Sequence, residues 1–201
     1  FLGTFLFYPL GNVFKEAFFP GGTFSLAYFR NIFSDPISRE AIANSFLLAI
    51  VATLLTALLA IPLAVMTVRF SFPAKGLLTG LLLVPMIMPP FVGAIGMRQF
   101  LARFGSANLM LMEAGVISSP IDWLGSSRFW GVVIMEVLHL YPIMYLNVTA
   151  ALANIDPAME EAAENLGCPP LRKFFRITLP LMMPGLFAGG TIVFIWSFTE
   201  L

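Results

Sequence analysis

The stretch FLLAIVATLLTALLAIPLAVMTV, residues 46–68, decides the fold of this chain. It runs for 23 residues without a charged side chain, and Asn44 and Ser45 precede it as a candidate helix cap. A bilayer core of about 30 Å requires roughly 20 apolar residues in helical form. Residues 46–68 therefore predict a transmembrane helix.

Four further stretches predict helices in the same environment: 1–14, the tail of an earlier helix; 77–97, broken by Pro85, Pro89 and Pro90; 129–153, interrupted by Glu136, His139 and Pro142; and 181–199. In hydrocarbon only helices and closed barrels satisfy the backbone, and these stretches are too long for barrel strands. The chain begins at Phe1 without an initiating Met and stops at Leu201 directly after an apolar run. We therefore expect an all-α membrane protein with about five transmembrane helix segments, the first and last truncated.

The composition agrees with a lipid environment. Hydrophobic residues make up 59% of the 201 residues and charged residues 11%, whereas a soluble domain has about 45–50% and 25%. The formal net charge of +0 argues against a nucleic-acid partner. Cys168 is the single cysteine, so no intrachain disulfide is possible.

The orientation follows from the connections between the spans. The connections at 69–76 and 154–180 lie on one side of the membrane, and those at 15–45 and 98–128 lie on the other. The first pair carries five Lys and Arg residues and the second pair carries six. The first pair, however, has only about half as many residues in total. The higher density of positive charge favours the cytoplasm for 69–76 and 154–180.

The connection at 156–180 predicts a helix–turn–helix elbow at the membrane surface. Asp156 is a good N-cap and Pro157 suits the first helical position. Gly167 suits a left-handed stop, Pro170 can open a second short helix, and Pro180 is expected to end it. One face of the first helix carries small or apolar side chains: Met159, Ala162, Ala163 and Leu166.

Seven positions of this elbow match a known signature in residue type and spacing: Glu161, Ala162, Ala163, Gly167, Ile177, Leu179 and Pro180. The chain thereby resembles the EAA-motif permeases of bacterial binding-protein-dependent importers, over nearly its whole length. The resemblance implies a type I importer permease-like bundle in which 156–180 is the cytoplasmic coupling loop. That loop docks in a cleft of an ATPase subunit in the family, so the resemblance also supports the orientation.

The resemblance implies a docking and coupling set in this sequence: Glu160, Glu161, Ala162, Ala163, Gly167, Arg172, Lys173, Arg176, Ile177, Leu179 and Pro180. Glu161 would offer charge or a hydrogen bond to the ATPase, and the two alanines would permit close packing. Arg172, Lys173 and Arg176 would face acidic ATPase residues or lipid phosphate.

The resemblance also implies partners and a location. Residues 1–201 would form a single, partial permease domain, one half of a longer two-domain permease, in the bacterial or archaeal cytoplasmic (inner) membrane. The expected partners are a cytoplasmic ATPase dimer, a periplasmic or extracellular substrate-binding protein, a second permease domain in the same chain or a homodimer, and the lipid bilayer. The sequence contains no GxxxxGK[ST] loop. We therefore expect no enzyme activity, catalytic residue, cofactor or metal in this chain, with ATP and magnesium on the partner.

Polar residues and prolines inside the spans are candidates for the translocation path: Pro85, Pro89, Pro90, Glu136 and His139. Glu136 and His139 are three residues apart and share a helix face, and ionisable groups in spans are functional suspects. The structural alternatives are that Glu136 lies near the interface or pairs with another span, and that the prolines serve packing. Glu200 is equally ambiguous. The pairs Gly76/Gly80 and Gly185/Gly189 predict close helix packing.

Three phrases resemble the ferric-iron branch of the family: 120–125, 150–156 and 196–201. They favour ferric iron as cargo, and they leave 2-aminoethylphosphonate, thiamine, sulfate or polyamines open. A distant alternative is a secondary transporter or channel driven by an ion gradient through Glu136 and His139.

Overall fold

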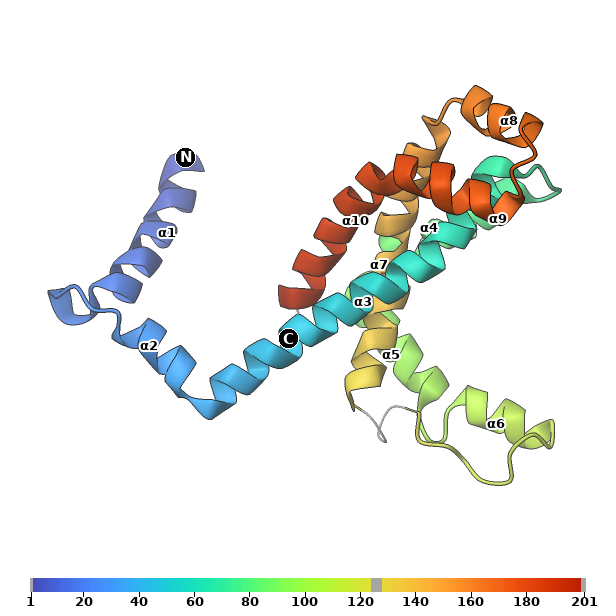
Figure 1. The fold of residues 1–201 in the computed structure, drawn as a ribbon. Coiled ribbons are helices and arrows are strands. Elements are labelled where there is room, and N and C mark those ends of the chain that lie inside the picture. Colours follow the sequence, from blue (N-terminus) through green and yellow to red (C-terminus); the bar gives the residue numbers. More distant parts are fainter. Residues whose placement is uncertain (1, 124–127, 200–201) are drawn as a thin grey trace. The chain divides into compact units, whose positions relative to one another are not determined.

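A computed structural model describes residues 2–123 and 128–199 of the chain (Figure 1). Within these residues the regular structure is helical and no strand occurs, which confirms the all-α prediction. Contacts divide the chain into two units, Phe1–Phe46 and Leu47–Leu201. Each unit is described by itself.

The first unit contains α1 (Leu2–Phe18), the short 3-10 turn η1 (Pro20–Gly22), α2 (Ala27–Ser34) and the beginning of α3 (Pro36–Arg69). The ring of Phe18 packs against two other rings, with its centroid 6.3 Å from that of Phe24 and 5.2 Å from that of Phe29. Asp35 caps α3, because its Oδ2 accepts from the backbone N–H and the hydroxyl of Ser38 at 2.9 and 2.7 Å.

The second unit contains the remainder of α3 and the helices that follow it: α4 (Lys75–Ile87), α5 (Pro90–Leu101), α6 (Ser106–Glu113), α7 (Arg128–Ala153), α8 (Pro157–Asn165), α9 (Pro170–Lys173), the π-helical turn η2 (Phe174–Thr178) and α10 (Leu179–Thr199). Within this unit α8 and α9 lie at one end of α7, and α5 and α6 lie at the other end (Figure 1).

Three helices in the described part of the chain are long and apolar enough to cross a membrane: Pro36–Arg69, Phe129–Ala153 and Pro170–Thr199. They contain the predicted spans 46–68, 129–153 and 181–199. The predicted span 77–97 instead forms the shorter helices α4 and α5, because Met88 before Pro89 is extended and Pro90 starts a new helix. The first predicted segment is helical in α1, which has 17 residues.

The core of the second unit is built around α7. Its buried side chains pack against Ala60 and Ala64 of α3 and against Met182 and Val193 of α10. Two tyrosines of α7 add polar ties: the Tyr145 hydroxyl donates to Thr67 Oγ1 at 2.9 Å, and the Tyr141 hydroxyl donates to the Leu82 carbonyl at 2.7 Å. Thus α7 is bonded to both α3 and α4.

Glycines set the distance between α7 and α10. A Cβ on Gly185 would lie 2.6 Å from Ala151 Cβ and 2.6 Å from the Asn147 carbonyl oxygen, so only glycine fits there. The predicted close packing at Gly185/Gly189 is therefore confirmed. A Cβ added at Gly76 or Gly80 would meet no atom within 4 Å beyond its own helix, so the close packing predicted at this pair is not found in the described part of the chain.

The connection between α5 and α7 is organised by one buried amide, that of Asn108 in α6. Its Nδ2 donates to the carbonyls of Arg103 at 3.0 Å and Ile121 at 2.6 Å. Its Oδ1 accepts from the Ile121 N–H at 3.2 Å and from Trp123 Nε1 at 3.0 Å. One side chain thus holds the residues after α5 and the segment 121–123 together.

Candidate functional site

The elbow that follows α7 has the local chemistry expected from its sequence. Asp156 Oδ1 accepts from the Ala158 N–H at 2.9 Å, and Pro157 is the first residue of α8. Gly167 has φ +74°, and the Cys168 N–H reaches back to the Ala163 carbonyl at 3.0 Å. This is a left-handed glycine stop of the Schellman type, so the predicted cap and the predicted stop are both confirmed.

The second half of the elbow differs from the prediction at its end. Pro170 opens α9 as expected, but the expectation that Pro180 ends a short helix is wrong, because the helix continues from Pro170 to Thr199. The Leu179 N–H bonds to the Phe174 carbonyl, five residues back. A proline ring in a regular α-helix clashes with the carbonyl four residues earlier, and the wider π-turn relieves that clash.

The inner side of the elbow is bonded to the membrane helices through Glu160. Glu160 Oε1 accepts from Arg69 Nη2 at 2.8 Å and from Thr178 Oγ1 at 2.8 Å. On α9, Lys173 Nζ donates to Glu164 Oε1 and closes the elbow on itself. Ala163 is also buried on this side. Glu160, Ala163 and Lys173, all in the predicted docking set, therefore have partners within this chain.

The other members of the set behave differently. Exposed members are Glu161, Ala162, Gly167, Arg172, Arg176 and Pro180, whereas Ile177 and Leu179 are half-buried. Apolar side chains are exposed beside them, with Met159 at 49% and Leu166 at 88%. The elbow thus has one side that is bonded to the membrane helices, which we call its inner side, and another side that is exposed, which we call its outer side.

The sequence does not predict Arg69 or Thr178 as members of this site. Arg69 is the last residue of α3 and lies 91 residues from Glu160 in the chain. Its only sequence signal is its place at the end of a span, on the same side of the membrane as the elbow. Thr178 gives no signal, because its hydroxyl could equally bond to its own helix.

The translocation candidates occupy other parts of the second unit. Pro85 lies inside α4, Pro89 lies in the break between α4 and α5, and Pro90 is the first residue of α5. Glu136 is buried, and its Oε2 accepts from the Ser197 hydroxyl of α10 at 3.3 Å. This contact is the pairing with another span that we kept as an alternative to a transport role. His139 is half-buried one turn further along α7, and Glu200 lies outside the described residues.

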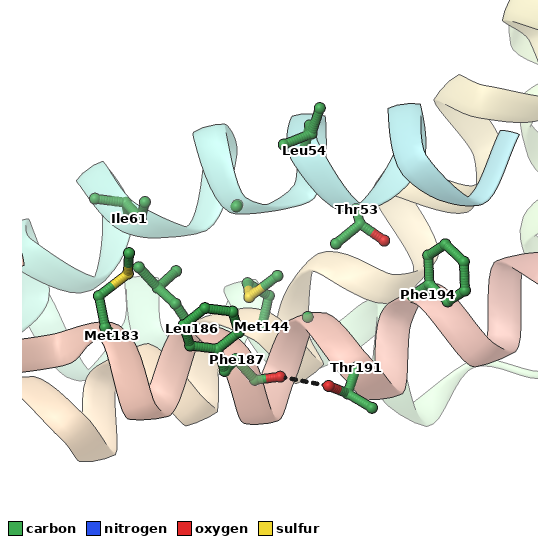
Figure 2. A pocket seen from close by; sticks show the side chains of 11 residues that line it. Thr53, Leu54, Ile61, Met144, Met183, Leu186, Phe187, Thr191 and Phe194 are labelled. Atoms are coloured by element: carbon green, nitrogen blue, oxygen red, sulfur yellow. Dashed lines mark hydrogen bonds between the residues drawn. The ribbon is translucent and has the colours of Figure 1, made fainter. Parts of the chain in front are cut away.

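An open cavity of about 410 Å³ lies between α3 and α10 (Figure 2). Its lining is apolar apart from two threonines: Thr53, Leu54, Ala57, Ile61, Met144, Met183, Leu186, Phe187, Gly190, Thr191 and Phe194. The Thr191 hydroxyl already donates to the Phe187 carbonyl at 2.8 Å. Such a lining suits an apolar side chain or lipid rather than a charged cargo. No group of three or more His, Cys, Asp or Glu suited to a metal occurs in the described part of the chain.

Comparison with known proteins agrees with the elbow and the spans. The family model described as "Binding-protein-dependent transport system inner membrane component" matches residues 58–201. The chain is similar to the spermidine/putrescine transport system permease protein PotB of Haemophilus influenzae, with 33% identity over 165 residues, 82% of this chain and 57% of PotB. It is also similar to a candidate ferric transport system permease protein, FbpB 1, of the same species, with 28% identity over 98% of this chain and 30% of that protein.

A third relative is the molybdenum transport system permease protein ModB of Escherichia coli, with 31% identity over 84% of this chain and 71% of ModB. Among solved structures, a bacterial ABC transporter involved in the import of the acidic polysaccharide alginate superposes with a TM-score of 0.76 at 20% identity. The superposition covers 96% of this chain and 67% of that one. The fold is therefore that of an importer permease, and the chain spans 57% of the length of the PotB relative.

Proposed function

Because the chain belongs to the family of binding-protein-dependent transport system inner membrane components, we propose that it acts as a permease subunit of an ATP-driven importer in the bacterial cytoplasmic membrane. The observation that carries the proposal is the two-sided elbow of α8 and α9. Its inner side is bonded to Arg69 and Thr178, and its outer side is exposed. A partner seated on the outer side would move α7 and α10 directly, because the elbow connects those two helices.

The partner that we propose for the outer side is a cytoplasmic ATPase. Glu161 supplies a carboxylate and Ala162 a surface without bulk, so another protein can approach the backbone of α8 closely. Leu166, 88% exposed, supplies apolar area that a protein partner would cover. Arg172 and Arg176 are exposed on the adjoining helix and suit acidic ATPase side chains or lipid phosphate.

The remaining partners complete the transport cycle. A substrate-binding protein would deliver cargo at the outer face, and a second permease domain would form the other wall of the path. ATP and magnesium would bind to the ATPase. Closure of the ATPase dimer would then shift the elbow as a rigid body and switch the path between outward-open and inward-open states.

The test of this function is retention of the ATPase. The permease is expressed with the ATPase encoded beside it, and the membrane complex is purified through a tag on the permease. Glu161→Arg is expected to remove the ATPase, since it places a positive charge and a longer side chain on the docking face. Glu113→Arg is the matched control, because Glu113 is exposed at the end of α6, in the connection that we place on the outer face.

Two results would overturn the proposal: an ATPase that stays bound to Glu161→Arg at the wild-type level, or transport in vesicles without ATP. The second result would favour the ion-gradient alternative through Glu136 and His139. In that alternative, Glu136→Gln would abolish uptake driven by a pH gradient alone.

For the cargo we propose a cation, with ferric iron first and a polyamine second. Relatives named for ferric iron and for spermidine and putrescine both align over most of the chain. The one carboxylate in spans 46–68, 77–97, 129–153 and 181–199 is that of Glu136, and the core of these spans is poor in basic residues. Ionisable groups within membrane spans often mark a substrate path, and an acidic group on that path would suit a cation better than an anion.

The cargo is tested on the substrate-binding protein encoded with the permease. Calorimetric titration with ferric citrate, spermidine, molybdate, thiamine and 2-aminoethylphosphonate should give a micromolar or tighter complex with iron or the polyamine. Tight binding of molybdate alone would contradict the cationic assignment and leave the importer function intact.

A further inference from the structure

Glu160 presents one carboxylate oxygen to two donors from different helices. Arg69 Nη2 and Thr178 Oγ1 both lie 2.8 Å from Oε1. The Glu160 side chain is 13% exposed, that of Arg69 is 24% exposed, and Thr178 is buried. Charge-assisted hydrogen bonds are shorter and stronger than neutral ones, and partial burial reduces their screening by water and salt. The cluster is therefore a firm contact and more than a surface ion pair.

The Glu160–Arg69 pair joins parts that the chain itself does not join. The polypeptide connects α8 to α7 on one side and to α9 and α10 on the other, whereas α3 has no direct connection to the elbow. In the described residues, Arg69–Glu160 is the one ion pair between α3 and α8. Lys75 Nζ donates to the Phe70 carbonyl at 3.2 Å, which ties the start of α4 to the same end of α3.

The hydrogen bond from Thr178 to Glu160 joins α8 to a second element, the π-turn η2. Thr178 is the last residue of the π-turn, the point where the helix departs from regular α geometry before it enters the membrane. A π-turn is one of the places at which a helix can bend sharply. A side-chain bond from this turn to α8 therefore fixes the angle at which α10 leaves the elbow.

We propose that Glu160 is the positioning residue that transmits movement of the elbow to α3 and stiffens the π-turn η2 that leads into α10. On this basis three membrane helices move with the elbow, α7 and α10 through the backbone and α3 through the Glu160–Arg69 pair. The role differs from that of its neighbour Glu161, which faces outward. The inference rests on the proposed function, because the movement comes from an ATPase.

Charge exchange tests the pair. Glu160→Arg, Arg69→Glu and the double exchange are prepared in the complete complex of permease, ATPase and binding protein in nanodiscs. Each single variant is expected to keep the ATPase bound but to lose stimulation of ATP hydrolysis by the binding protein by at least about tenfold, because one charge is left without its partner. The double exchange should recover most of the stimulation.

A conservative series separates coupling from folding. Glu160→Gln keeps an acceptor for both donors without the charge, and Thr178→Ser keeps the hydroxyl while Thr178→Val removes it. Stimulation is expected to be highest in the wild type, lower in Glu160→Gln and lowest in the single charge reversals, and to survive Thr178→Ser better than Thr178→Val. Equal stimulation in wild type, Glu160→Gln and Thr178→Val would overturn the inference.

Distance measurement gives a readout that does not depend on cargo. After Cys168→Ser, spin labels are placed at Ser71, two residues beyond α3, and at Asn165, the last residue of α8; both are accessible enough to carry a label. If α3 follows the elbow, the distance between the labels stays the same in the ATP-free and vanadate-trapped states. In Glu160→Gln the distance is expected to differ between the two states.

The possible outcomes distinguish a failure of the inference about Glu160 from a failure of the proposed function. A wild-type complex in which the distance itself changes with nucleotide would overturn the inference alone, since α3 would not follow the elbow. Loss of the ATPase from Glu160→Arg to the same extent as from Glu161→Arg would also overturn it and make Glu160 a docking residue. A wild-type chain that retains no ATPase would remove the proposed function and the inference with it.

Discussion

Replacing Gly185 by alanine is expected to destabilise the packing of α7 against α10, whereas the same replacement at Gly80 should stabilise the protein slightly. An added Cβ at Gly185 meets Ala151 Cβ and the Asn147 carbonyl oxygen, each at 2.6 Å. Carbon atoms in contact normally lie about 3.5–4.0 Å apart, and a backbone carbonyl cannot turn away as a flexible side chain can. An added Cβ at Gly80 meets no atom within 4 Å.

The magnitude follows from two terms. Alanine in place of a helical glycine stabilises the folded state by roughly 0.5–1 kcal/mol at either position, and overpacking a fitted contact costs about 1–3 kcal/mol. Because the first term is common to both variants, the difference between their free energies of unfolding isolates the second. For a chain of this size each kcal/mol shifts Tm by about 2–4 °C, so the two variants should melt about 2–12 °C apart.

The assay is thermal unfolding in detergent, followed by tryptophan fluorescence and near-UV circular dichroism. Gly189→Ala provides a graded point, because its Cβ would lie 3.0 Å from the Met144 sulfur, which can shift, and 3.1 and 3.2 Å from Asn147 Cβ and Met144 Cα, all longer than the 2.6 Å contacts at Gly185. Ala151→Gly removes one of the two contacts at Gly185 and should recover part of the loss in the double variant. A Gly185→Ala protein that melts at or above the temperature of the Gly80→Ala protein would refute the conclusion that glycine is required where α10 packs against α7.

Three further predictions concern single polar or backbone features. Asn108→Leu should expose the 102–123 connection to proteolysis, because each buried group left unpaired, including Trp123 Nε1, costs about 1–3 kcal/mol. Gly167→Ala should cost about 1–2 kcal/mol, read as faster amide hydrogen exchange in α8, since φ is +74° with open space around it. The hydroxyl and N–H of Ser38 lower the pKa of the Asp35 carboxyl below 3.8. The hydrogen bonds that cap α3 are therefore complete above pH 3.8 and are lost as the pH falls through the lowered pKa of Asp35. Ser38→Ala should raise the pKa of Asp35, which an NMR titration of this carboxyl measures.

The features that the sequence predicts correctly are those governed by local rules. The uncharged run at 46–68 needs no partner to require a helix, because lipid offers the backbone no other hydrogen bonds. Asp156 and Gly167 act within a few residues of their own position, one through an N-cap and the other through its freedom to adopt positive φ. Their roles therefore follow from residue type and spacing alone.

The features that the sequence does not predict depend on tertiary structure or on changes of helical register. Pro180 is expected to end a helix only if the preceding turn is a regular α-turn, and the π-turn removes that condition. The charged partner of Glu160 is 91 residues away, although three basic residues of the elbow itself are nearer in sequence. Which of them a carboxylate meets is decided by the side of α8 on which it lies, and that depends on how the elbow sits against α3.

The consecutive acidic residues of α8 explain why one short motif can serve two interfaces. Neighbouring residues on an α-helix point about 100° apart, so Glu160 meets the bundle while Glu161 is exposed, and Ala163 is buried while Ala162 is exposed. Helix α8 is thus a single layer between the membrane helices and the proposed ATPase, with small residues on both sides because both must be approached closely. A substitution at 161 or 162 should separate the ATPase from the complex, whereas one at 160 or 163 should leave it bound but uncoupled. The two kinds of failure share one helix, and ATPase retention distinguishes them.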